Sequence, residues 1–193
     1  MSKIETLVAD IYQLFQQSHE VSEDNLEVLA QSVKEVMRES LAQKMSKSEN
    51  KLRLSNLGWP SRKLFFSIKR HREKEQETRS SNPQDQIKFL VGHLMEQVLL
   101  FLAKEAGHEV SDEGKYVEID GVRGKLDAKI DGTTVDVKTA SNHGFDKFSS
   151  GEILLGEEND PFGYLYQLGG YLDSQDEQEG GLLAFNKESG EIS

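Results

Sequence analysis

The spacing of apolar side chains along the chain predicts helices first and strands later. Apolar residues recur every three or four positions over 3–17, and again from Ser22, a residue type that caps helices, to about Lys44. The same period returns over 86–106 with a broader apolar surface, which is typical of a helix buried against a sheet. Gly107 follows this segment and is expected to end its helix.

The strand candidates that follow lie at about 108–119, 122–130 and 133–139. Asp131-Gly132 joins the last two, and this pair is typical of a two-residue hairpin turn. The remaining elements are expected to be a short helix at 61–72, a helix at 162–172 and a strand at 181–186, with loops at 45–56, 73–85 and 141–160. The order of helix, three strands, helix and strand predicts an α/β fold with a mixed sheet flanked by helices.

The composition places the chain among soluble globular proteins. Its 193 residues suffice for one moderate domain with an accessory part, and 36% of them are apolar. Without cysteine, the chain cannot form disulfides, thiolate zinc sites or iron–sulfur clusters. It shows no signal-peptide pattern, and no apolar run approaches the length that spans a membrane. These features predict a soluble intracellular protein with a helical N-terminal extension over 1–50 and a core over 51–193.

The net charge of −11 argues against a nucleic-acid partner, but the charge is unevenly distributed. Residues 44–79 hold eleven lysines and arginines and four glutamates, a local excess of +7 that leaves the rest of the chain near −18. A basic stretch on an acidic protein can bind phosphates. It can equally be a solvated connector, and charge alone favours neither interpretation.

The hairpin predicted around Asp131-Gly132 brings two aspartates together. The pairing that this turn sets places Asp127 opposite Asp136. Like charges in that arrangement repel each other and destabilise the hairpin. A divalent cation bound between the two carboxylates would offset this repulsion. Lys138 follows Asp136 by two residues and therefore projects from the same face.

Because side chains alternate along a strand, this hairpin has two faces. One face is expected to be core and holds Leu126, Ala128, Ile130, Val135 and Val137. The other face holds Lys125, Asp127, Lys129, Thr134, Asp136 and Lys138. A solvated polar face is the alternative to a metal site, since amphipathic hairpins commonly have one.

Two helical segments carry polar residues that suit a site. Glu96 lies among apolar neighbours, where a carboxylate is costly unless it is paired or bound to metal. It could instead lie on a narrow polar edge of its helix. Gln167 and Tyr171 are one turn apart and share a helix face. An amide and a phenol together suit phosphate oxygens and an end nucleotide, although Tyr171 could simply be a core residue.

In this order and spacing, these residues resemble the motifs of the PD-(D/E)XK nuclease superfamily, in its RecB-like and phage-exonuclease branch. The matching motifs, spread over about 55–186, are Ser55-Asn-Leu-Gly-Trp-Pro-Ser-Arg62, Gly92-His-Leu-Met-Glu96, Gly124-Lys-Leu-Asp127, Asp136-Val-Lys138 and Gln167-Leu-Gly-Gly-Tyr171. Glutamate at position 96 is similar to the lambda-exonuclease-like members, whereas many RecB-type members have histidine there. Trp59 stands near the position where cluster-bearing relatives have cysteine, so the chain resembles the version without an iron–sulfur cluster.

The resemblance implies a restriction-endonuclease-like core over 51–193 that hydrolyses DNA phosphodiester bonds with Mg²⁺ or Mn²⁺. It assigns the metal to the oxygen donors of Glu96, Asp127, Asp136 and the Val137 carbonyl. Lys138 is expected to orient the attacking water or to neutralise charge on the phosphate. The implied substrate-binding residues are Gln167, Tyr171, Arg62 and Ser55, with Lys63 and 69–72 as further backbone contacts. His93, one turn before Glu96, is either a structural histidine or a further ligand.

The QxxxY-like motif favours an exonuclease of phage-type DNA recombination, repair or degradation, in the cytoplasm of a bacterium or a phage-infected cell. The alternatives are an endonuclease on the same scaffold, a catalytically inactive DNA-binding protein, and an adaptor whose N-terminal helices recruit a recombinase. The expected partner is DNA. A recombinase, a single-strand-binding protein and a second copy of the chain are further candidates, and no membrane is expected.

Overall fold

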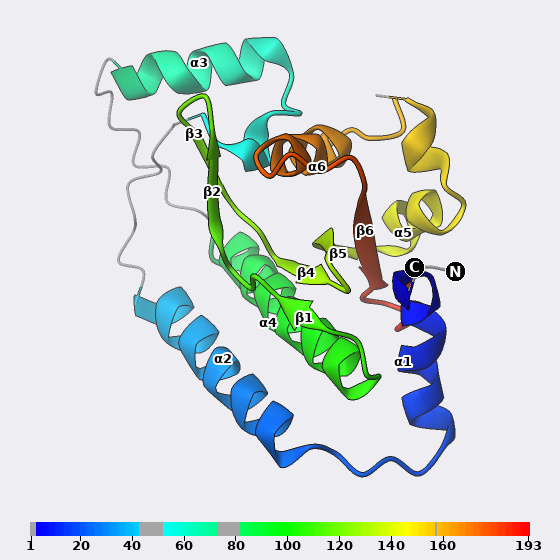
Figure 1. Ribbon diagram of the computed structural model, residues 1–193. Helices are drawn as coiled ribbons and strands as arrows, with labels where there is room; N and C mark the ends of the chain where they lie inside the picture. The colour runs from blue at the N-terminus through cyan, green and yellow to red at the C-terminus, as the bar shows by residue number, and fades with distance from the viewer. Residues whose placement is uncertain (1–2, 43–51, 73–81, 157) are drawn as a thin grey trace.

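The computed structural model describes residues 3–42, 52–72, 82–156 and 158–193, arranged as Figure 1 shows. The helical elements are η1 (Lys3–Thr6), α1 (Leu7–Gln16), α2 (Glu23–Ala42), η2 (Leu54–Asn56), α3 (Ser61–Arg72), α4 (Pro83–Glu105), α5 (Asn142–Ser149), η3 (Glu152–Leu155) and α6 (Tyr164–Asp173). The strands are β1 (Val110–Ser111), β2 (Tyr116–Ile119), β3 (Val122–Lys125), β4 (Ala128–Ile130), β5 (Thr133–Ala140) and β6 (Gly180–Asn186). The predicted loops at 45–56 and 73–85 lie in large part outside the described residues, as do the side chains of 70–72.

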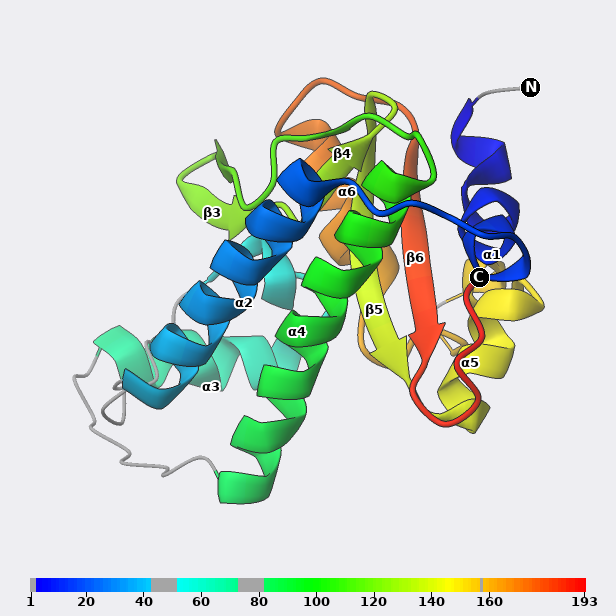
Figure 2. The ribbon, with the colours of Figure 1, turned by 90° about the horizontal axis from the view of Figure 1, so that it is seen from below.

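Four strands form one mixed sheet in the order β1-β4-β5-β6. β5 and β6 are parallel, whereas β4 is antiparallel to both of its neighbours, β1 and β5. In Figure 2, α4 lies in front of this sheet and α6 lies behind it. The chain is therefore an α/β protein with a mixed sheet flanked by helices, which confirms the predicted class, while the restriction-endonuclease-like core stays a prediction.

The two faces of the sheet pack against different helices, because side chains alternate along each strand. One face meets α1 and α4 in the main core, which contains Leu7, Ile11, Leu99, Leu100, Ala103, Ala128, Ile130, Val135, Val137 and Leu183. On the other face, Phe145 of α5 packs on Ala140 and Ala184, and α6 contacts β5 and β6. The helix α1 thus shares its core with the sheet, and the domain boundary near residue 50 stays a prediction.

Most predicted helices have the expected positions, and α4 begins earlier than expected. Asn82 accepts a hydrogen bond from the Gln84 N–H and Pro83 follows it in the first turn, so the helix begins before 86. The sequence prediction had placed the Asn-Pro pair in a loop. At the other end, Gly107 has φ 85° and ends the helix as predicted.

The expectation that no apolar run approaches membrane-spanning length was wrong for α4. By length and composition it is the one helix within the described part of the chain that could cross a membrane. A core helix of a soluble protein passes the same test. Leu99, Leu100 and Ala103 near the C-terminal end of α4 are buried in the main core, whereas Ile87 and Phe89 near its start are exposed.

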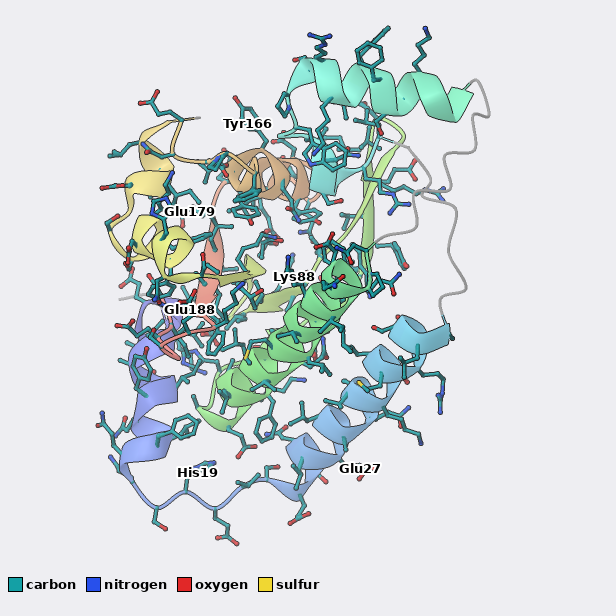
Figure 3. The ribbon with its side chains drawn as sticks, turned by 180° about the vertical axis from the view of Figure 1, so that it is seen from behind. His19, Glu27, Lys88, Tyr166, Glu179 and Glu188 are labelled. Carbon is teal, nitrogen blue, oxygen red and sulfur yellow. The ribbon has the colours of Figure 1, made fainter. Side chains whose placement is uncertain are left out.

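The N-terminal helices are joined to the end of α4 through Glu105. Its carboxylate accepts hydrogen bonds from Asn25 and from the Ser22 N–H, and it contacts His19 at 2.7 Å. Figure 3 shows His19 in the connection between α1 and α2. Burial alone would raise the pKa of Glu105, but these partners outweigh it and lower the pKa. Ser22 also caps α2 as predicted, because its Oγ accepts the Asn25 N–H.

The β4–β5 hairpin has the predicted turn and register. Asp131 and Gly132 have φ of 49° and 83°, the two left-handed residues of a type I′ turn. Ile130 pairs with Thr133, and the ladder continues through Ala128 opposite Val135. Leu126 departs from the prediction: it joins a second cluster with Leu54, Val117 and Tyr171 instead of the main core.

Two of the predicted strands are each divided. The segment at 108–119 forms β1 and β2, and the segment at 122–130 forms β3 and β4. Asp112 has φ 53° between β1 and β2, and the pairing shifts by one residue across it, from Val110 opposite Ile130 to Tyr116 opposite Lys125. A bulge of this kind bends a hairpin, and here it separates the two-stranded β2–β3 sheet from the main one.

The structure corrects two further expectations. The segment 141–160 is not a continuous loop, because it contains α5 and η3. The polar face of the hairpin is not a solvated face either, because Thr134 and Asp136 are fully buried. On the same face Lys129 is paired with Glu177. The cause is α6, which covers the face that sequence alternation alone would leave to solvent.

Candidate functional site

The two aspartates lie where the β4–β5 ladder ends. Ala128 and Val135 are its last pair, so Asp127 and Asp136 are the next residue on each side. At this point the Asp127 side chain takes the place of a strand partner: its Oδ2 accepts a hydrogen bond from the Val137 N–H at 2.7 Å. The N–H and C=O of one strand residue point to the same edge, so the Val137 carbonyl also faces this side.

Asp136 is fully buried between the sheet and α6. Its Oδ1 accepts a hydrogen bond from Gln167 Nε2 at 3.0 Å, and its Oδ2 lies 2.5 Å from Lys138 Nζ. Despite this short contact, Oδ2 has no hydrogen bond of acceptable geometry. The Lys138 ammonium group therefore compensates the charge of this oxygen as an ion pair.

The predicted amide and phenol reach the acids from α6. Gln167 Nε2 donates a second hydrogen bond to Tyr171 Oη at 3.0 Å, and Lys138 donates to Gln167 Oε1 at 3.4 Å. Gly124 permits this close packing, because a Cβ there would lie 2.6 Å from Tyr171 Cε1. Tyr171 is therefore a core residue and a neighbour of the acids at once.

Glu96 is half-buried on α4 and interacts with the two aspartates through its charge, which acts to raise the pKa of both. Its carboxylate is directed to other partners. Gln97 donates a hydrogen bond to it at 3.2 Å, and His93 Nδ1 lies 3.6 Å away. His93 is exposed, and its hydrogen bond to Glu96 is the main cause of a raised pKa. In this arrangement His93 is a partner of Glu96.

The electrostatics of the site favour a proton, or another cation, between the aspartates. Burial, the charge of Asp136 and the charge of Glu96 raise the pKa of Asp127 to about 8. Burial also raises the pKa of Asp136, against the lowering effects of Lys138 and of a side-chain hydrogen bond with Asp127. Asp127 is thus protonated at neutral pH and donates to its neighbour. A metal ion could replace that proton.

The predicted ligands do not form a complete metal cage as they stand. In the described ranges there is no group of three or more His, Cys, Asp or Glu side chains placed to hold a metal ion. Asp127 and Asp136 are together, whereas the Glu96 carboxylate faces His93 and Gln97. The site thus consists of a pair of acids with a third nearby.

Comparison with known proteins gives no independent assignment: no family model, curated protein or solved structure matches the chain. The geometry of the site is therefore the main basis for a function.

Two predicted substrate-binding residues are not part of this network. Ser55 is exposed on η2, and Arg62 is exposed on α3, with its guanidinium 5.9 Å from the Phe66 ring. What the structure shows of η2 is a packing role. Leu54 is fully buried against Gly124 and Tyr171, beneath the site.

Two residues that the sequence prediction missed belong to the site. The Tyr164 ring lies 5.0 Å from Lys138 Nζ, and the Asp136 charge acts on its phenol. Asp160 is buried and accepts hydrogen bonds from the Tyr164 and Leu165 N–H groups at 2.9 and 2.8 Å. Asp160 lies three residues before Gly163, the N-cap of α6, so it does not have the usual spacing of a capping residue. The sequence prediction had placed it in the loop at 141–160.

Proposed function

We propose that the chain is a divalent-metal-dependent nuclease that hydrolyses DNA phosphodiester bonds at the Asp127–Asp136 pair. The observation that carries the proposal is that the fully buried Asp136 carboxylate lies beside the partly buried Asp127, with Lys138 on Asp136 and the Glu96 charge acting on both. Such a pair destabilises the fold unless a proton or a metal ion joins it. Strongly perturbed acids of this kind are concentrated at functional sites.

The donor set suits Mg²⁺ or Mn²⁺. Asp127, Asp136 and Glu96 offer carboxylate oxygens and Val137 a carbonyl, and these ions prefer such hard ligands. The structural feature that fits a cation is the fully buried Asp136 carboxylate beside Asp127, whose pKa is raised to about 8. When bound, the ion would lower the pKa of a coordinated water and offset charge on the phosphate. The chain has no cysteine thiolates to offer an iron–sulfur cluster.

Lys138 has the clearest role among the neighbouring residues. Asp136 and Gln167 hold its ammonium group beside the acids. From there it would orient a water or stabilise the negative charge that develops on the phosphate. Gln167 holds Asp136 through Oδ1, so it is a positioning residue for an acid, with Tyr171 behind it.

The proposed preference for DNA ends depends on one resemblance: residues 167–171 are similar to the QxxxY motif. The exposed Arg62 and Lys63 of α3 are candidate contacts to the DNA backbone, which makes binding weaker at higher salt. An exonuclease of this kind would act in the cytoplasm of a bacterium or phage-infected cell, alone or with a recombinase, a single-strand-binding protein or a second copy of the chain.

The test is digestion of end-labelled linear DNA and of a nicked circle, with Mg²⁺ or with EDTA. We expect the linear DNA to be degraded only with Mg²⁺. Lys138→Ala is expected to lower the rate about 100-fold or more, because charge stabilisation at the phosphate is removed. The matched control is Lys187→Ala, an exposed lysine, which should retain full activity. Undiminished digestion by a well-folded Lys138→Ala protein would contradict the role of Lys138.

The same assay separates two alternatives. Equal cleavage of the circle identifies an endonuclease on this scaffold. The absence of a ready three-ligand group within the described residues favours a second candidate, a protein that binds DNA without cutting it. Such a protein would retard DNA in a gel-shift experiment and would release no product with Mg²⁺ or Mn²⁺.

A further inference from the structure

A row of aromatic rings leads from the acid pair to the surface. We call Phe148, Tyr164 and Phe162 the aromatic row. The Tyr164 ring stacks on Phe162 at 5.5 Å and on Phe148 at 5.9 Å between centroids, with interplanar angles of 27° and 30°. Lys138 Nζ lies 5.0 Å from the same Tyr164 ring. The lysine beside Asp136 therefore contacts the middle ring of the row.

Exposure increases along the row. Phe148 and Tyr164 are partly buried, whereas Phe162 is 65% exposed. The backbone beneath is held in place, because Asp160 binds the Tyr164 and Leu165 N–H groups. Because the Phe162 ring stays exposed to water, it contributes little hydrophobic stabilisation to the folded protein. It is available to bind a flat partner by stacking.

A second aromatic group borders the row. Gly58 and Gly163 touch backbone to backbone, since a Cβ on Gly58 would lie 2.2 Å from Gly163 Cα. This contact sets Trp59 beside the start of α6. Lys63 Nζ lies 3.6 Å from the Trp59 ring. Rings and cations thus alternate near the start of α6. Tyr166 of α6, also half-exposed, projects away from the sheet (Figure 3).

We propose that the aromatic row is a stacking subsite for unpaired nucleobases, so that the site takes single-stranded DNA or a frayed duplex end. The subsite rests on the proposed function and adds a strand preference to it. Bases in an intact duplex are already stacked on one another, whereas those of a single strand are free to stack on protein rings. With one base on Phe162, the adjoining backbone lies toward Lys138 and the acid pair. Recognition by stacking is independent of sequence, as nonspecific digestion requires.

The test measures DNA binding in EDTA, where no cleavage can occur. Fluorescence anisotropy is followed for a labelled oligo-dT and for a blunt hairpin duplex of equal nucleotide count. The variants are Phe162→Ala and the control Phe15→Ala, which removes a ring 73% exposed on α1. Both rings are exposed, so both variants should fold.

We expect the wild type to bind the single strand more tightly than the duplex. Phe162→Ala should weaken single-strand binding about tenfold, the effect of losing one stacked base, and Phe15→Ala should not. Equal single-strand affinity in Phe162→Ala and the wild type would overturn the subsite, as would tighter binding of the duplex.

The outcome is independent of catalysis. If oligo-dT binds through Phe162 but no DNA is digested with Mg²⁺, the subsite stands and the nuclease proposal fails. If DNA is digested and Phe162→Ala binds and cuts like the wild type, the nuclease stands and the subsite fails.

Discussion

At the residue scale, Asp127 has the most unusual electrostatic environment of the site. Its carboxyl group binds the Val137 N–H of β5 just beyond the last β4–β5 pair, in a place where a strand partner would normally lie. That position brings it against the buried Asp136 and raises its pKa to about 8. The proton that the two acids share at neutral pH marks where a cation would lie.

The raised pKa of Asp127 predicts how the metal-free protein responds to pH. Between about pH 4 and pH 8 the folded protein retains a proton that the unfolded chain releases, so the free energy of unfolding falls as pH rises. The slope should approach about 1.4 kcal/mol per pH unit for one proton. Urea unfolding in EDTA at several pH values measures it.

Asp127→Asn should remove this slope, whereas the exposed Asp120→Asn should leave it unchanged. Asp120 has φ 49°, a conformation that asparagine tolerates, which makes it a suitable control. Stability that rises with pH over the same interval in the wild type would show that the aspartates are not coupled as described.

At the element scale, the turn chemistry made the site predictable. Asp131-Gly132 set the hairpin register, and the register placed Asp127 and Asp136 one step beyond the last pair. Local signals could not show that α6 covers the polar face, because that burial comes from residues about thirty positions later in the chain. The orientation of Glu96 toward His93 was equally hidden, since it depends on side-chain packing.

The contact between Gly58 and Gly163 predicts contrasting effects of two glycine substitutions. Gly58→Ala forces a Cβ to within 2.2 Å of backbone that cannot move like a side chain, so we expect a loss of about 2 kcal/mol in the free energy of unfolding. In Gly169→Ala the new Cβ meets nothing within 4 Å inside a helix, and a gain of about 0.5–1 kcal/mol is expected. Chemical unfolding of both variants measures the difference. A neutral Gly58→Ala would mean that η2 and α6 are not closely joined.

At the scale of the whole molecule, the chain is acidic, whereas the α3 helix carries exposed basic residues. The exposed Arg62 and Lys63 lie on α3, and Figure 1 shows α3 on the same side of the molecule as α6. Exposed basic residues on that side of the molecule suit the phosphate backbone of DNA. The sequence revealed this uneven charge, but the distance between α3 and the acids depends on the Gly58–Gly163 contact, which only the fold shows.

Calorimetric titration with Mn²⁺ measures whether Asp127 and Asp136 hold a divalent cation. We predict saturable binding to the wild type that tightens as pH rises, because the ion displaces the proton of Asp127. Binding should be lost in Asp136→Asn. A folded wild type that binds no Mn²⁺, or an Asp136→Asn protein that binds it equally well, would contradict the account.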